Sequence, residues 1–148
     1  MRGVESDVST RVLDASVAVR WIVPEEGSEE AARLLDQPIA WIAPRLMLTE
    51  AASALRRKVT GEGLRVELAA QAVEALVQAV TDGVIRLADD EDLVLAALML
   101  ALTSGHKVPD CLYIALAERQ GAGLVSADRR LTALARERGI PTQLIPSA

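Results

Sequence analysis

The stretch that decides the fold reads PDCLYIALA at residues 109–117 and GLVSAD at residues 123–128. Its first part predicts a helix, because proline is well tolerated in the first helical turn and the apolar residues after it continue for two turns. Its second part predicts a short strand that begins at a glycine and ends before Asp128. If this helix and strand belong to one parallel sheet, Asp110 and Asp128 lie near the same edge of it.

The rest of the chain alternates short apolar runs with helical segments in the same way. Strands are predicted at residues 11–13, 39–43, 84–87, 124–126 and 142–145. Helices are predicted at residues 17–23, 28–35, 44–60, 64–81, 89–104, 109–120 and 128–138. Ser28 is expected to cap its helix, and Pro44 to occupy the first position of the next one. The alternation is typical of an α/β sandwich in which helices flank a central, mainly parallel sheet of four to five strands.

Length and composition indicate one globular domain, expected at residues 11–148 behind a flexible tail at residues 1–10. The net charge of −5 argues against strong non-specific binding to nucleic acid, and a single Tyr, two Trp and no Phe offer few platforms for stacked bases. The lone Cys111 cannot form an intramolecular disulfide. The N-terminus does not resemble a signal peptide. The apolar run at residues 93–102 is too short to span a bilayer. These features predict a cytoplasmic protein with no membrane partner.

Three aspartates are expected at the same edge of the sheet. Asp14 and Asp128 each follow an apolar strand, and Asp110 begins a helix. Any one of them alone is explained as a helix N-cap, which contributes about 1 kcal/mol. Together they repel, by roughly 4 kcal/mol for a pair about 4 Å apart at an effective dielectric constant of 20. A hard divalent cation compensates such a cluster, which predicts a metal site and attack on a phosphodiester by a metal-activated water.

Glu50 is a fourth acidic candidate, for which the pattern alone favours a surface position. The predicted apolar stripe of its helix is Leu48, Ala52, Leu55 and Val59, and Glu50 lies almost opposite that stripe. A solvated glutamate is the ordinary interpretation of this placement. The residues one turn further on are small and offer no ion-pair partner, so the pattern leaves room for a ligand without requiring one.

Other chemically suggestive residues have simpler interpretations. The acidic run at residues 89–92 lacks the glycine and terminal glutamate of a calcium loop, and is interpreted as helix N-terminal charge. His106 is interpreted as a loop residue and Cys111 as a core residue. The aromatic residues are interpreted as packing residues: Trp21, Trp41 and Tyr113. The basic groups at residues 56–58 and 129–130 are either a solvated face or contacts for phosphate.

Four segments, taken in order, resemble the PIN-domain family and, more narrowly, the VapC-type toxins of bacterial toxin–antitoxin pairs. They read VLDASVAVRW at residues 12–21, LTEA at residues 48–51, DCLYIALA at residues 110–117 and LVSADRRL at residues 124–131. The match covers essentially the whole chain from Arg11, and the four segments are specific as a set although none is specific alone. Ser126 stands where threonine is common in the family, and Pro109 departs mildly from the residue usual before the third acid.

This resemblance implies a PIN fold and an endoribonuclease that depends on Mg²⁺ or Mn²⁺. It assigns the catalytic acids to Asp14, Glu50, Asp110 and Asp128, of which all but Glu50 are expected to hold the metal. Ser16 and Ser126 are expected to support the site without binding the ion directly. The implied partners are an RNA substrate, a small antitoxin that places a basic residue at the acids, and a second copy of the chain. The apolar excess on the helix at residues 64–81 is the place where such partner contacts are expected.

Three other classes of function are weighed against the nuclease. One is a regulatory binding protein with a PIN-like pocket and weak catalysis, which the presence of all four acids disfavours. Another is a phosphatase of a different α/β fold, which requires a second aspartate two residues after the first, where Ser16 stands instead. A phospho-acceptor receiver domain is disfavoured too, because it requires an acidic pair at the first strand.

Overall fold

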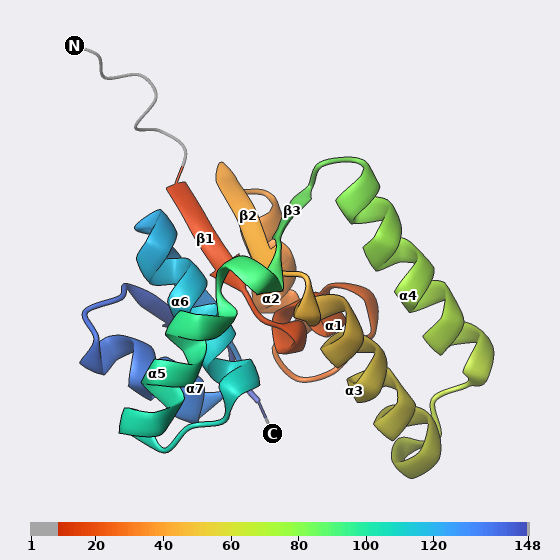
Figure 1. Ribbon diagram of the computed structural model, residues 1–148. Helices are drawn as coiled ribbons and strands as arrows, with labels where there is room; N and C mark the ends of the chain where they lie inside the picture. The colour runs from red at the N-terminus through yellow and green to blue at the C-terminus, as the bar shows by residue number, and fades with distance from the viewer. Residues whose placement is uncertain (1–8, 148) are drawn as a thin grey trace.

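A five-stranded parallel sheet forms the middle layer of the protein, with helices on both faces. The computed structural model describes residues 9–147. The strands are β1 (Ser9–Leu13), β2 (Ile39–Pro44), β3 (Ile85–Ala88), β4 (Gly123–Ser126) and β5 (Thr142–Leu144). The helices are α1 (Ala15–Ile22), α2 (Ser28–Leu35), α3 (Leu46–Glu62), α4 (Val66–Thr81), α5 (Val94–Ser104), α6 (Val108–Gln120) and α7 (Arg129–Glu137). Figure 1 shows α1 to α4 gathered on one side of the sheet and α5 to α7 on the other. The predicted sandwich of four to five parallel strands is confirmed.

The strand order β3-β2-β1-β4-β5 places the first strand in the centre of the sheet. From β1 the chain winds outward through β2 to β3, and then returns to the other side of β1 to form β4 and β5. The direction of winding therefore reverses between β1 and β4, which pair in parallel with Leu13 beside Val125. In open α/β sheets, ligands bind at the carboxyl ends of the strands at such a reversal. In this chain those ends lead directly into Asp14 and Asp128.

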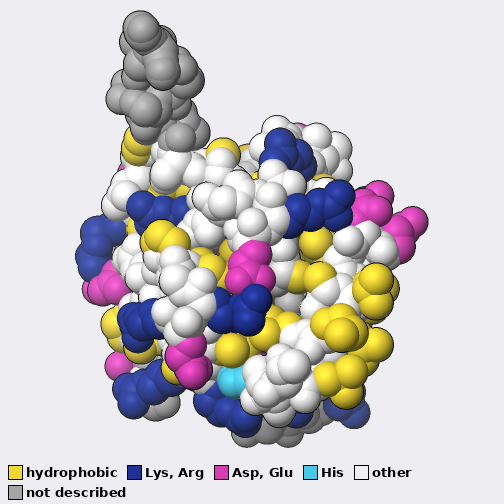
Figure 2. All heavy atoms as spheres, turned by 60° about the vertical axis from the view of Figure 1, so that its left-hand side comes forward, with side chains coloured by type: hydrophobic (Ala, Val, Ile, Leu, Met, Phe, Trp, Pro, Cys, Tyr) yellow, Lys and Arg dark blue, Asp and Glu magenta, His cyan; other side chains and the backbone are white. Residues whose placement is uncertain are grey.

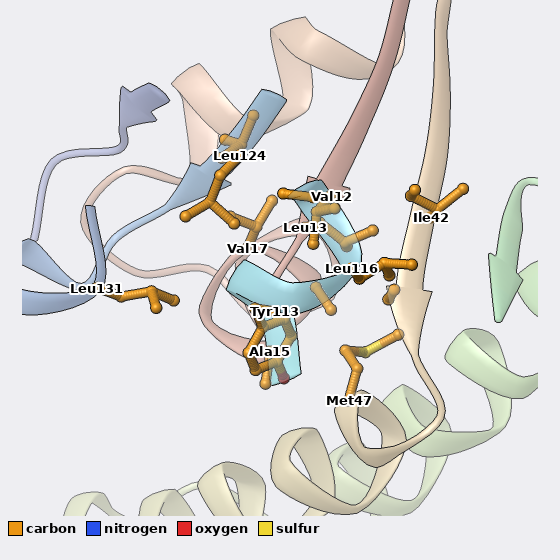
Figure 3. Close-up of a cluster of buried hydrophobic side chains, with 14 of the residues drawn as sticks. Val12, Leu13, Ala15, Val17, Ile42, Met47, Tyr113, Leu116, Leu124 and Leu131 are labelled. Atoms are coloured by element: carbon orange, nitrogen blue, oxygen red, sulfur yellow. The ribbon is translucent and has the colours of Figure 1, made fainter. Parts of the chain in front are cut away.

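Helix α6 is the central helix of the molecule and corresponds to the segment PDCLYIALA. Its residues Cys111–Ala117 are all buried, because α6 packs on β1, β2 and β4 with one side and against α5 with the other. Figure 3 shows Tyr113 and Leu116 of this helix among side chains from β1, β2 and α1. Cys111 lies in the core, as predicted, and burial raises the pKa of its thiol. An unbroken apolar run is what a helix buried on both sides requires.

The predicted starts of α2 and α3 are wrong, and the contacts of the helices explain why. The helix predicted at residues 89–104 also begins later, because Asp90–Asp92 forms a separate 3-10 turn before α5. Pro44 is the last residue of β2 and does not open α3. It still pairs in register with Ala88 of β3. Ser28 is the first residue of α2 and does not cap it; its hydroxyl accepts a hydrogen bond from the backbone N–H of Glu25 at 3.0 Å. Strand pairing and a turn before the helix thus decide these positions.

The first strand begins at Ser9, two residues inside the stretch that was expected to be a tail; residues 1–8 of that predicted tail lie outside the described residues. The two tryptophans pack edge to face, with ring centroids 5.1 Å apart, as expected of packing residues. Over residues 9–147, none of the helices combines the length and the apolar character that crossing a membrane requires.

Candidate active site

Asp14 is the buried acid at the centre of the site. It follows β1 and precedes α1, and although it occupies the N-cap position its carboxylate makes no capping hydrogen bond. Its two oxygens accept hydrogen bonds from two hydroxyls, Ser16 Oγ at 2.5 Å and Ser126 Oγ at 2.7 Å. Burial raises the pKa of Asp14 to about 6, although both hydroxyls act in the opposite direction. The capping interpretation therefore fails for this residue.

Ser16 and Ser126 also connect Asp14 to the last acid. Ser126 ends β4 and is completely buried, and its Oγ accepts a hydrogen bond from the backbone N–H of Asp128 at 2.9 Å. Ser16 Oγ accepts one from the backbone N–H of Ala127 at 3.0 Å. The two hydroxyls thus bridge the ends of β1 and β4 and fix the distance between the two segments. A supporting position is what the sequence predicts for both serines.

Asp128 does act as a helix cap. Its Oδ1 accepts hydrogen bonds from the backbone N–H groups of Arg130 at 2.9 Å and Leu131 at 3.2 Å, at the start of α7. The cap leaves Oδ2 without a hydrogen-bond donor among the described residues. The residue is exposed and lines the cleft, so the aspartate that caps α7 is also part of the site.

Glu50 reaches the same cleft from α3, since the predicted apolar stripe of that helix was wrong by about one position. The residues of α3 that are buried are Met47, Ala51 and Leu55, and Glu50 flanks this row. The carboxylate is half-buried, and the hydroxyl of Tyr113 donates a hydrogen bond to its Oε1 at 2.5 Å. Burial raises the pKa of Glu50, and the Tyr113 hydrogen bond partly offsets that rise. The surface interpretation of Glu50 is wrong.

Asp110 completes the set from the first turn of α6. Burial raises the pKa of its carboxyl, and the negative charge of Asp128 adds to the rise, while the nearby charges of Lys107 and Arg130 act against it. Asp110 and Asp128 both line the same cleft. This agrees with the common edge that the sequence predicts.

The four acids line one open cleft of about 330 Å³, together with Ser16 and Tyr113. The other lining residues are Ala15, Ser53, Ala54 and Arg57. Sequence reasoning placed the acids and the two serines there, but it interpreted Tyr113 as a packing residue and left Arg57 undecided within a basic run. The spacing carried a signal for Arg57, because residues 50, 53 and 57 follow one another at one-turn intervals on the same face of a helix.

The donors in this cleft fit a hydrated divalent cation. Within the described residues 9–147, no three acidic, histidine or cysteine side chains come close enough together to enclose an ion. Magnesium usually takes one or two carboxylates directly and keeps several waters, so a closed cage is not required. Burial raises the pKa of Asp14, Glu50 and Asp110, and the nearby positive charges, Arg57 at Glu50 and Lys107 and Arg130 at Asp110, only partly offset that rise. An oxygen-lined cleft with unbalanced negative charge suits a hard cation.

The comparisons with known proteins agree with this geometry. The sequence model of the PIN domain family matches residues 11–137 of this chain. Ribonuclease VapC3 of Pyrobaculum aerophilum is 32% identical over 120 residues, which cover 81% of this chain and 90% of the relative. The crystal structure of VapC20 of Mycobacterium tuberculosis, described as a toxin that cleaves the sarcin–ricin loop, has a TM-score of 0.67 at 17% identity and covers 84% of this chain and 94% of that one.

A second solved structure, VapBC-5 of M. tuberculosis, is described as a member of the VapBC family of toxin–antitoxin systems. Its TM-score is 0.52 at 17% identity, covering 94% of this chain and 99% of that one. At these identities the two structures show a common fold. The family match and the 32% identical relative each extend over most of the chain, and they show that this protein belongs to the PIN domain family, in its VapC-type branch.

Proposed function

We propose that this protein is a metal-dependent endoribonuclease and acts as the toxin of a toxin–antitoxin pair. The observation that carries the proposal is the convergence of Asp14, Glu50, Asp110 and Asp128 on one cleft at the reversal point of the sheet. The similarity to Ribonuclease VapC3 supports RNA as the substrate. Placing four carboxylates in a half-buried cleft costs free energy, which binding of a cation would offset. The bound cation could in turn hold a phosphodiester.

The residues of the cleft have separate roles in this proposal. Asp14, Asp110 and Asp128 would hold Mg²⁺ or Mn²⁺, which supplies positive charge at the phosphate and lowers the pKa of a water. The hydroxyls of Ser16 and Ser126 keep the Asp14 carboxylate in one orientation. Glu50, on the opposite wall, is placed to accept a proton from the attacking water, and the 3′-oxygen of the cleaved bond leaves.

Two basic residues border the acids and would contact the RNA backbone. Arg57 lines the cleft from α3 and forms no ion pair with any residue from 9 to 147. Arg130 lies in the first turn of α7, and its charge lowers the pKa of Asp110. Lys58, in contrast, is engaged with Glu25 at 3.1 Å. The phosphates on either side of the scissile bond would therefore meet Arg57 and Arg130, and not the whole basic run.

The antitoxin would bind the apolar groove between the end of α1 and α4. This groove has a volume of about 280 Å³ and is lined by Ile22, Val23, Pro24, Leu64, Leu68, Gln71, Ala72 and Ala75. The eight residues of α1 separate it from Asp14, which is a distance of about 12 Å. An apolar segment seated there can extend a basic side chain to the acidic cleft. Charge complementarity at the cleft is the feature that selects this partner.

The experiment that tests the nuclease is the substitution Asp14→Asn. Wild-type protein is expected to cleave RNA when Mg²⁺ or Mn²⁺ is present and to stop when EDTA is added. Asp14→Asn is expected to lose cleavage and growth inhibition while its circular dichroism spectrum is unchanged. Asp36→Asn, an exposed acid outside the cleft, serves as the matched control and is expected to cleave normally. Undiminished cleavage by purified Asp14→Asn would overturn the assignment.

A further inference from the structure

Tyr113 is the only tyrosine of the chain, and its ring is almost completely buried, with 1% of its surface exposed. It lies in α6 one turn after Asp110. Figure 3 shows the ring beside Ala15, among the buried side chains that join α6 to β1 and α1. A phenylalanine would fill this volume equally well. The hydroxyl therefore needs an explanation of its own.

The hydroxyl of Tyr113 ends at the wall of the cleft and donates its hydrogen bond to Glu50 at 2.5 Å. The direction of this bond follows from the environment. Burial, and then the negative charges of Glu50 and Asp14, raise the pKa of Tyr113, so the phenol keeps its proton at neutral pH. A protonated phenol is a donor, and an ionised carboxylate is an acceptor only.

Glu50 depends on this one contact. Among the side-chain hydrogen bonds of residues 9–147, the bond from Tyr113 is the only one that Glu50 receives. The cleft neighbours Ser53 and Ala54 give it no hydrogen bond, and Arg57 acts on it through its charge without forming an ion pair. Without the phenol, three rotatable bonds would be free to turn the carboxylate toward solvent.

The same side chain also lies beside the first residue of α1. Figure 3 shows Tyr113 next to Ala15, and the backbone of Ala15 lowers the pKa of Tyr113 against the larger effects that raise it. Ala15 directly follows Asp14, the most buried acid of the site. Tyr113 on α6 thus holds the acid of α3 through its hydroxyl and lies beside the helix start that follows the acid of β1.

We propose that Tyr113 is a positioning residue, whose hydroxyl holds the Glu50 carboxylate in the cleft that it shares with Asp14. The proposal rests on the nuclease function for its kinetic readout, and on metal binding for a readout that does not require cleavage. It assigns no contact between Tyr113 and substrate. Its effect should therefore appear only when Glu50 is present as an acid.

A double-mutant cycle of Tyr113→Phe and Glu50→Gln tests this dependence. Tyr113→Phe removes one oxygen atom and keeps the buried ring, so the protein is expected to fold. Cleavage by Tyr113→Phe is expected to fall by about tenfold to a hundredfold, the range that a misplaced catalytic group produces. In the Glu50→Gln background the same change is expected to alter the remaining cleavage by less than about twofold. Trp21→Phe, which removes an aromatic hydrogen bond to the carbonyl of Ala31 away from the cleft, is the matched control and is expected to cleave normally.

The second readout is Mn²⁺ binding, measured by titration calorimetry on the same four proteins of the cycle. As a single substitution, Tyr113→Phe is expected to weaken Mn²⁺ binding, because a displaced Glu50 carboxylate adds less negative charge near the ion that the three aspartates would hold. When Glu50 is already Gln, the same substitution is expected to leave Mn²⁺ binding unchanged. Equal losses in both backgrounds, or wild-type cleavage and Mn²⁺ affinity in Tyr113→Phe, would overturn the positioning role. If the wild type binds Mn²⁺ but cleaves no RNA, the nuclease proposal fails and the binding cycle still decides the role of Tyr113. A wild type that does neither overturns both proposals.

Discussion

Asp14 carries an electrostatic cost that the fold itself does not need. Raising its pKa from 3.8 to about 6 makes its ionised form about 3 kcal/mol more costly in the folded protein than in the unfolded chain. Because the folded state binds the proton more tightly, this contribution to the free energy of unfolding decreases as the pH rises from about 4 to about 6. Above about pH 6 the full cost is present, and Asn, which has the same shape and no charge, avoids it.

Asp14→Asn is therefore expected to be more stable than the wild type at neutral pH in EDTA, by up to about 3 kcal/mol. The difference should shrink toward zero near pH 4, where the wild-type carboxyl is protonated in the folded state. Urea unfolding of both proteins at the two pH values measures it. Added Mg²⁺ should stabilise the wild type more than the variant. A variant that is less stable than the wild type at neutral pH would show that the burial cost has been misassigned.

Arg57 and Arg56 provide a residue-scale test of how RNA enters the cleft. Arg57 lines the cleft and Arg56, its neighbour in the sequence, does not. Arg57→Ala is expected to raise KM for single-stranded RNA several-fold and to leave kcat within about twofold of the wild type. The slope of the logarithm of the RNA binding constant against the logarithm of salt concentration should fall by the amount that corresponds to about one lost phosphate contact. Arg56→Ala is the matched control. Equal effects of the two substitutions would indicate a diffuse basic surface and no defined contact.

At the scale of elements, the orientation of α3 depends on the loop after β3. Asp90 Oδ1 accepts a hydrogen bond from the backbone N–H of Leu46 at 3.3 Å, and Asp89 pairs with Arg45 at 2.9 Å. The prediction that the acidic run at residues 89–92 heads the helix that continues to residue 104 is wrong: Asp90–Asp92 forms a short 3-10 turn before α5, whose own first turn holds no acid. Asp89 and Asp90 contact the start of α3 instead. This contact holds the helix that carries Glu50.

Asp90→Ala is expected to lower the free energy of unfolding by about 1 kcal/mol, because the first turn of α3 loses its acceptor. Hydrogen exchange of the amides in that turn should become faster, while exchange in α6 is unchanged. Glu91→Ala, an exposed acid in the same run, is the matched control. Unchanged exchange in α3 after Asp90→Ala would contradict this capping role.

Local sequence patterns predicted three of the four acids but not Glu50. Asp14, Asp110 and Asp128 could be predicted because strand ends and helix starts are local features. The position of Glu50 could not, because the buried row of α3 is set by what the helix packs against, and only the family resemblance assigned Glu50 to the site. The hydrogen bond from Tyr113 joins residues 63 positions apart, which no local pattern records.

At the scale of the whole molecule, exposed apolar side chains gather on α5. These side chains are Val94, Leu95, Leu98, Met99 and Leu102, whereas α4 exposes Val66, Leu68 and Val77. Figure 2 shows a cluster of hydrophobic side chains on the face it presents, among separate basic and acidic ones. A second copy of the chain remains the predicted partner, and α5 has more exposed apolar surface for it than the helix at residues 64–81.

A double variant on α5, Leu95→Glu with Leu102→Glu, is expected to convert a dimer into a monomer in light scattering. Both side chains are 71% exposed, so the substitutions should leave the fold intact. Val77→Glu, a 47% exposed position on α4, is the discriminating control. Dissociation by Val77→Glu alone would place the dimer contact on α4, and a wild type that is monomeric at high concentration would remove the dimer prediction altogether.

Because the direction of winding reverses between β1 and β4, the residues of the proposed active site can be separated onto two fragments of the chain. The turn around Gly83 separates a first half that carries Asp14 and Glu50 from a second half that carries Asp110 and Asp128. A chain cut there would leave two inert fragments, each with half of the acids. Their recombination through the pairing of β1 with β4 and of β2 with β3 would rebuild the cleft. If each half were fused to a different protein, RNA cleavage would be restored only when those two proteins bind each other. RNA cleavage would then report that interaction.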